Sequence, residues 1–198
     1  GLNPHVVIQP NSFQIDKIYI SRLKKNFENI TISKSYSGEG IVISNDKAKG
    51  VILKGIDKSE KNIIEFFKNF TSQGDLNNFN SNKVFIGSEL AFNFKLKKDD
   101  TINLMTSSFV GTPLGNLPKQ ENFKVAGIFN TGFIEFDQNV IFINIEDALS
   151  IFNKDDKDQN IEIYLEDPLK ANFYKENIQK LNENYFIYTW SDLNKSLF

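Results

Sequence analysis

The sequence has no cysteine among its 198 residues and only one histidine, one methionine and one tryptophan. Without cysteine there is no disulfide framework and no thiol nucleophile. No apolar run approaches the ~20 residues that a membrane-spanning helix needs, and the first residues lack the charged and apolar segments of a signal peptide. The net charge of -2 provides no basic face, so no nucleic acid is expected as a partner.

Groups suited to catalysis or metal binding are also scarce. His5 is the only histidine, and its place beside an apolar strand favours a structural or surface role over that of a catalytic base. "DDKDQN" at 155–160 resembles the start of a calcium loop, but Ile161 stands where such a loop needs glycine, so a solvated turn is expected. "GEG" at 38–40 lacks the spacing of a phosphate-binding loop. We therefore expect no catalytic, cofactor-binding or metal-binding residues and no enzyme activity in this chain.

What is present is typical of a folded α+β protein: 40% of the residues are hydrophobic and 24% are charged. Period-two or continuous apolar runs predict strands at 4–9, 30–37, 40–45, 49–57, 83–87, 101–105, 123–129, 140–145, 161–165 and 185–190. Helical spacing predicts helices at 16–30, 58–70, 88–94, 146–152, 167–181 and 191–198. Their expected N-terminal caps include Asp16, Ser88, Asp167 and Ser191.

The order of these elements predicts a split αβ layer with a β-rich insertion. The Asn-rich segment 71–83 is the expected boundary, and "GEG" is expected to form the turn between the strands at 30–37 and 40–45. We therefore expect one subdomain from residues 1–80 and 150–198, with a β-rich subdomain at 81–149 inserted between its halves.

The stretch "TSSFVGTPLGNLPKQENF" at 106–123 carries four large apolar residues among two glycines and two prolines. Because proline removes a backbone donor, this segment is expected not to pair along its length, but to project as a stiffened loop or ragged hairpin. At ~25 cal/mol per Å² of apolar area, a partner that covered even two of these side chains would gain a few kcal/mol. Alternatively, the loop folds back and these side chains complete the core.

Several motifs, in order along the chain, resemble the periplasmic domain of LolC and LolE, which are the membrane subunits of lipoprotein-releasing ABC transporters. These domains belong to the wider group of MacB-like and FtsX-like transporter ectodomains. The motifs are "GLNPHVVI", "KGVILKGID", "VFIGSELAFNFKLKKDDTINLM", "FKVAGIFNTGFIEFDQNVIFINIEDA", "LEDPLKA" and "TWSDLNKSLF". The resemblance covers nearly the whole chain and is closest to LolC. It implies a porter-like αβ layer, a sabre-like inserted subdomain, and ends that each continue into a membrane helix of a bacterial inner-membrane protein.

The resemblance also implies a protruding hairpin, here called the hook, that binds the periplasmic chaperone LolA. The hook comprises Ser107, Ser108, Phe109, Val110, Gly111, Thr112, Pro113, Leu114, Gly115, Asn116, Leu117 and Pro118. Beside its base lie Asn103, Gln120 and Glu121. Asn103 and Glu121 replace arginines of the family, which puts a basic contact with the chaperone in doubt. Asp99 replaces a turn glycine, and it is expected to preserve the turn because aspartate tolerates the left-handed conformation.

Further partners implied by the resemblance are the cytoplasmic ATPase LolD, a second LolC/LolE-type subunit and lipoprotein substrates. The sequence leaves open whether the subunit is LolC, LolE or a hybrid that pairs with itself. Two other functions remain as alternatives: a MacB-like or FtsX-like ectodomain of an efflux or cell-division transporter, and a secreted hydrolase or metal-dependent enzyme.

Overall fold

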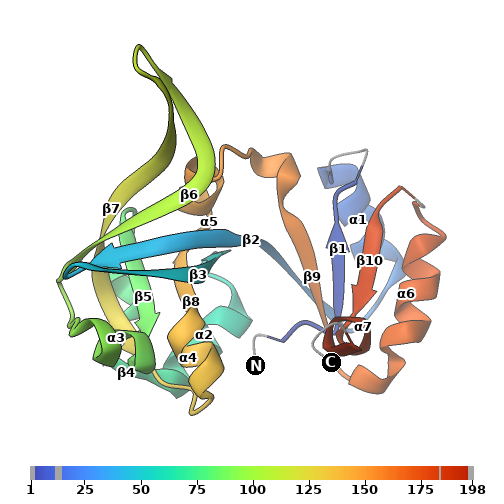
Figure 1. Cartoon of the computed structure of the whole chain (residues 1–198). Helices are drawn as coiled ribbons and strands as arrows, with labels where there is room; N and C mark the ends of the chain where they lie inside the picture. Colours follow the sequence, from blue (N-terminus) through green and yellow to red (C-terminus); the bar gives the residue numbers. More distant parts are fainter. Residues whose placement is uncertain (1–2, 12–14, 183, 196–198) are drawn as a thin grey trace. The chain divides into compact units, whose positions relative to one another are not determined.

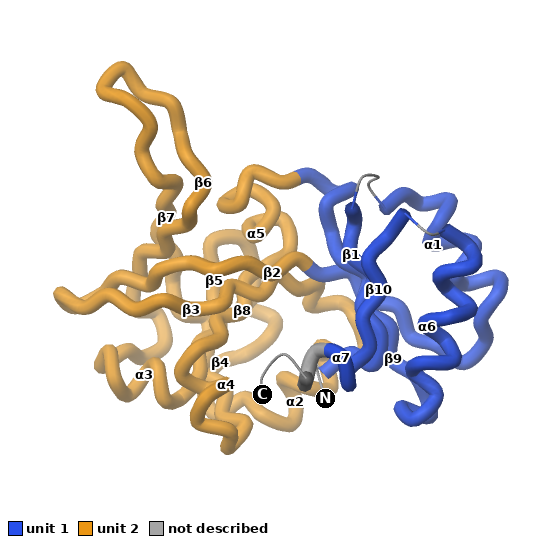
Figure 2. The backbone as a smooth tube through the Cα atoms, turned by 45° about the vertical axis from the view of Figure 1, so that its right-hand side comes forward, with its two compact units in different colours: residues 1–35, 155–198 blue, residues 36–154 orange. Residues whose placement is uncertain are grey.

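The computed structural model describes residues 3–11, 15–182 and 184–195 (Figure 1). The chain forms two compact units (Figure 2). Unit 1 contains residues 1–35 and 155–198, and unit 2 contains residues 36–154. The α+β class is confirmed, with one unit inserted in the sequence of the other.

Unit 1 is an antiparallel sheet in the order β10-β1-β9-β2, with helices α1 and α6 covering one face (Figure 2). Alternation in β9 turns Ile161 and Ile163 towards the helices, where they pack with Leu23 of α1 and Ile178 of α6. The elements of this unit are β1 (Val6–Gln9), α1 (Lys17–Asn26), the first part of β2 (Ile30–Ser44), η2 (Asp156–Asp158), β9 (Asn160–Leu165), η3 (Pro168–Lys170), α6 (Ala171–Gln179), β10 (Phe186–Thr189) and α7 (Trp190–Lys195).

Unit 2 is built on a ring of strands that closes on itself. The strands pair in the order β2-β3-β8-β5-β7-β6, and β6 pairs in turn with β2, so the sheet forms a barrel. β4 pairs with the last residues of β7, Gly127 to Phe129, beyond the end of the ladder between β7 and β6. The strands, besides the second part of β2, are β3 (Lys47–Ile56), β4 (Thr71–Gly74), β5 (Lys83–Gly87), β6 (Thr101–Thr112), β7 (Gly115–Phe129) and β8 (Val140–Asn144).

The barrel core is apolar, and helix α5 contributes to it. Ala148 and Ile151 of α5 pack in the same cluster as Leu53, Leu104 and Phe123 from the strands. Phenylalanines of α2 pack on phenylalanines of β5 and β8: the ring of Phe67 is tilted against Phe85 and meets Phe142 edge to face. The remaining elements are α2 (Lys61–Phe70), η1 (Leu76–Asn78), α3 (Ser88–Phe94), α4 (Ile134–Asn139) and α5 (Ile145–Ile151).

The structure corrects the expected turn at "GEG". β2 runs without a break from Ile30 to Ser44, and the chain reverses at Asn45 and Asp46 instead. A Cβ at Gly38 would lie 2.6 Å from the Phe152 ring, and one at Gly40 would lie 2.8 Å from Leu53. These glycines therefore allow close packing inside a strand and do not form a turn.

The domain boundaries also differ from the expected ones. The units divide between residues 35 and 36 and between 154 and 155, so residues 36–80 lie in unit 2 and not with the first residues of the chain. The Asn-rich segment is not a linker, because Phe79 within it is fully buried. Asn144 donates hydrogen bonds to the carbonyls of Phe79 (3.2 Å) and Asn80 (2.6 Å), which fastens the segment to the barrel.

Two of the four predicted helix caps are confirmed. Asp16 accepts a hydrogen bond from the amide of Tyr19 at the start of α1, and Asp167 accepts one from the amide of Leu169, which caps the 3-10 helix η3 that leads directly into α6. Ser88 is not a cap, because α3 already begins there and Gly87 takes the cap position.

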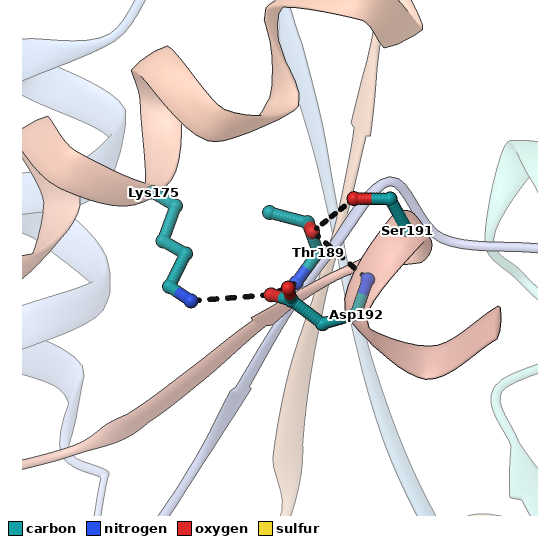
Figure 3. A network of polar contacts seen from close by, with 4 residues as sticks. All are labelled: Lys175, Thr189, Ser191 and Asp192. Carbon is teal, nitrogen blue, oxygen red and sulfur yellow. Dashed lines mark hydrogen bonds and ion pairs between the residues drawn. The ribbon is translucent and has the colours of Figure 1, made fainter. Parts of the chain in front are cut away.

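Ser191 is not the cap of α7 either, because that helix begins at Trp190. Thr189 takes this role: its hydroxyl accepts from the amide of Asp192 (3.3 Å), and the Asp192 carboxylate accepts from the Thr189 amide (3.0 Å) (Figure 3). Asp192 also accepts from Lys175 of α6 at 3.1 Å.

Within the described ranges, no helix combines the length and the apolar character needed to cross a membrane.

Candidate docking site at the hook

The hook is a two-stranded ribbon formed by the outer ends of β6 and β7, and it rises away from the barrel (Figure 1). Its pairs run from Phe109 opposite Pro118 to Thr112 opposite Gly115. The expectation that the prolines prevent pairing along this segment is therefore wrong. Pro118 lacks a donor but still takes its place in the ladder, since the outer ribbon has no third strand that would require its amide.

The hook exposes large apolar side chains on both of its faces. Phe109 is 58% exposed, Val110 46% and Leu117 51%, while Leu114 at the tip is 93% exposed. Directly opposite residues of an antiparallel pair share a face, so Val110 and Leu117 lie on one face and Phe109 and Pro118 on the other. The alternative in which these side chains complete the core is wrong.

The tip has a turn that its sequence specifies. Pro113 and Leu114 connect the strands, and the Thr112 hydroxyl both accepts from the amide of Leu114 (3.2 Å) and donates to the carbonyl of Gly115 (2.7 Å). Gly115 has φ +114°, in the region that favours glycine. These contacts hold Leu114 outward at the end of the ribbon.

The residues beside the hook base do not lie on one face. Asn103 pairs with Asn122 and Gln120 with Met105, whereas Glu121 pairs with the buried Leu104 and so points to the opposite side. Asn103 donates to the Asn122 side chain at 3.0 Å.

The negative charge of Glu121 affects the titration of Asp147 in helix α5. Burial, together with the nearby Glu121 and Glu146, raises the pKa of Asp147. One face of the hook base is therefore uncharged, and the face towards α5 carries both Glu121 and Lys119, whose ammonium contacts the carbonyl of Ser150. At Asp99 the expected left-handed turn is confirmed, with φ +72°.

An open apolar groove of about 790 Å³ lies on the outer face of the barrel and reaches the hook. Ile41 of β2, Ile52 of β3, Met105 of β6 and Pro118 of β7 line it. Ile41 is opposite Met105, and Met105 is two residues along the chain from Ser107, where the hook begins. This groove was not expected from the sequence, although the alternation in β2 and β3 indicates that Ile41 and Ile52 face outward.

The other candidates have structural explanations. Nδ1 of His5 accepts a hydrogen bond from the amide of Leu165 at 2.7 Å, and burial lowers the pKa of His5. Asp155 accepts a hydrogen bond from the amide of Lys157, and Asp158 accepts one from the amide of Asp155, so the two form a reciprocal capping box at the start of η2, as expected for a solvated turn. Among the described residues, no group of three or more His, Asp or Glu side chains is placed to hold a metal ion.

Comparison with known proteins agrees with the resemblance to LolC that the sequence motifs indicate. It is 28% identical over 206 residues to the "lipoprotein-releasing system transmembrane protein LolC" of Buchnera aphidicola subsp. Schizaphis graminum, which covers 98% of this chain and 49% of that protein. The periplasmic region of MacB from Actinobacillus actinomycetemcomitans matches the structure with a TM-score of 0.58 and 14% identity, over 100% of this chain and 93% of that one. The chain is LolC-like, with the MacB periplasmic fold.

A second structure agrees with the fold of this LolC-like domain. The extracellular domain of the noncanonic ABC-type transporter YknZ from Gram-positive bacteria matches with a TM-score of 0.60 and 12% identity, over 94% of this chain and 100% of that one. No protein-family model matches the chain. The LolC-like domain spans about half the length of the Buchnera relative. Together these comparisons show a chain that is similar in sequence to LolC and has the fold of the MacB and YknZ domains.

Proposed function

We propose that this LolC-like domain belongs to a membrane subunit of a lipoprotein-releasing ABC transporter and that its hook binds the periplasmic chaperone LolA. The observation that supports this most directly is the paired, exposed apolar surface of Phe109, Val110, Leu114 and Leu117 on a ribbon that stands off the barrel. Water disfavours such a surface, so a partner that covers it gains free energy.

Lipoprotein release requires a soluble carrier that accepts the acyl chains. Each acyl CH₂ that leaves the bilayer costs ~0.8 kcal/mol, so extraction needs an energy source and an apolar carrier on the other side. In this proposal the ATPase LolD hydrolyses ATP in the cytoplasm, and the membrane helices transmit the motion. The domain itself binds and positions the chaperone, and it makes or breaks no covalent bond.

The hook geometry also suits rapid, reversible docking. The turn contacts of Thr112 and the cross-strand pairs order the ribbon before any partner arrives. A preordered segment loses less conformational entropy on binding than a loop. The groove lined by Ile41, Ile52 and Met105 continues the apolar surface from the hook onto the barrel.

Charged substitutions on the hook test the proposal. Phe109→Glu and Leu114→Glu are each measured for binding of purified LolA to the 198-residue chain, beside the control Leu169→Glu, whose leucine is 85% exposed but lies in unit 1. We expect the two hook variants to lose at least tenfold in affinity, because each places a charge where apolar contact is needed. The control should bind like the unchanged protein.

Equal affinity in all variants would remove the hook from the proposal. No binding of LolA by the unchanged chain would favour the alternative of an efflux or cell-division transporter with a different periplasmic partner, with which the MacB and YknZ folds are also compatible.

A further inference from the structure

The ladder between β6 and β7 is interrupted where the hook leaves the barrel. Met105 is opposite Gln120 and Phe109 is opposite Pro118, so residues 106–108 of β6 face Lys119 alone on β7. An irregularity of this kind breaks the ladder and bends the strand. Without other contacts, the interruption would leave the hook free to swing about its root.

The last turn of α5 supplies those contacts. The ammonium of Lys119 donates hydrogen bonds to the carbonyl of Ser150 and to Oδ1 of Asn153 (3.1 Å). Nδ2 of Asn153 donates to the carbonyl of Phe109 at 3.5 Å. Lys119 and Asn153 therefore connect both strands of the hook root to one helix end.

The position of Lys119 is favourable for a cation. Carbonyls of the last helical turn have no partner within the helix and carry partial negative charge, which a lysine ammonium neutralises. Asn153 follows the helix with φ +54°, a left-handed conformation that asparagine tolerates. In this backbone conformation the side chain of Asn153 reaches Lys119 and Phe109 at the hook root.

β6 has attachments of its own to the barrel and to the end of α5, and they do not involve Lys119 or Asn153. Thr106 is opposite Gly40 of β2, and its hydroxyl donates to the carbonyl of Ile151 at 2.8 Å. Thr106 is only 4% exposed, whereas Lys119 is half-buried. Removal of the Lys119 ammonium therefore affects the hook root without opening the barrel core.

We propose that Lys119 is a positioning residue for the hook: its ammonium, bound to the end of α5 together with Asn153, fixes the direction in which the hook leaves the barrel. The effect on the hook follows from these contacts alone. The consequence for the chaperone rests on the proposed function, since a hook that is held in place loses less entropy when LolA binds.

The test replaces the ammonium and keeps the aliphatic stem. Lys119→Met is compared with Lys119→Arg, which restores a cation, and with the control Lys124→Met, an exposed lysine of the same strand. Amide hydrogen exchange of residues 107–118, without any partner, reports the order of the hook, and the thermal midpoint reports global stability.

We expect Lys119→Met to speed exchange of the hook amides by about fivefold or more, because charge-assisted hydrogen bonds are lost. The thermal midpoint should stay the same, Lys119→Arg should restore protection, and Lys124→Met should have no effect. Asn153→Gly, which keeps the left-handed backbone but removes the side-chain amide, should also loosen the hook.

The affinity for LolA then separates the positioning role of Lys119 from the proposed function of the hook as the LolA-binding site. Lys119→Met should bind about fivefold more weakly than the unchanged chain. Unchanged hook exchange in both Lys119→Met and Asn153→Gly, or a uniform rise over all of unit 2 with a lower midpoint, would overturn the positioning role. Failure of the unchanged chain to bind LolA would instead overturn the proposed function and leave the exchange result standing.

Discussion

Val110 lies directly opposite Leu117 across the hook, and each side chain remains about half exposed. A cross-strand apolar pair stabilises a hairpin by ~0.2–1 kcal/mol. That gain is small beside the free energy that a partner would gain by covering the exposed apolar area of the two side chains. The pair therefore orders the ribbon and at the same time presents an apolar face to a partner.

The hook tip is expected to contribute almost nothing to stability. Leu114→Ser, at a side chain that is 93% exposed, should change the free energy of unfolding by less than ~0.5 kcal/mol. Leu104→Ala, at a fully buried side chain of the same strand pair, should cost ~2–5 kcal/mol. Urea unfolding measures both. A similar loss in the two variants would mean that the tip packs against the body of the protein.

Gly115 is expected to be needed for its backbone conformation. Nothing lies within 4 Å of a Cβ built there, but φ is +114°. Gly115→Ala should therefore disturb the turn through backbone strain of about 1 kcal/mol or more and accelerate hydrogen exchange at the tip. Gly50→Ala is the matched control, since Gly50 also has free space around it but no positive φ. Equal protection of the hook amides in both variants would contradict this role.

Unit 1 is expected to lose stability in acid through Asp192. The hydrogen bond from the Thr189 amide, and then the one from Lys175, lower the pKa of Asp192 to about 2 (Figure 3). Since the pKa of an unfolded aspartate is ~3.9, the stabilisation is fully present above that pH and is lost as the pH falls towards 2. Asp192→Asn should reduce the slope of unfolding free energy against pH between about 4 and 2. The same slope in both proteins would exclude this carboxylate as the source.

The buried carboxylate of Asp137 is expected to be essential for the turn before α4. It is 2% exposed and accepts from the Thr131 amide (3.0 Å), the Thr131 hydroxyl (2.6 Å) and the Gly132 amide (3.1 Å). Asp137→Ala should lower the free energy of unfolding by ~2–4 kcal/mol, because these donors lose a charged acceptor. The control Glu135→Ala, on the exposed side of the same helix, should be nearly neutral. Comparable denaturation midpoints for the two variants would be inconsistent with this role.

Features that depend on neighbours in sequence could be predicted. Asp16 and Asp167 cap their helices because a side chain and the amide that it binds are two or three residues apart. Asp99 adopts the left-handed turn that its residue type allows. The α+β class and the insertion of one unit in the other follow from the order of apolar patterns alone.

Features that depend on distant contacts could not be predicted. Gly38 and Gly40 resemble turn residues until Phe152 and Leu53 are known to pack over them. The Asn-rich segment resembles a linker, but the side chain of Asn144 fixes it to the barrel. The groove requires β2 and β6 to be neighbours, and they are far apart in the sequence.

The most direct test of the central claim is a crosslink formed in the complete transporter. A photoreactive amino acid replaces Leu114 at the hook tip or, as a control, the similarly exposed Leu169 of unit 1, and the membranes are irradiated in the presence of LolA. We predict a covalent adduct with LolA from position 114 and none from position 169. An adduct of equal yield from both positions, or none from position 114 while lipoprotein release continues, would contradict the claim that the hook receives the chaperone.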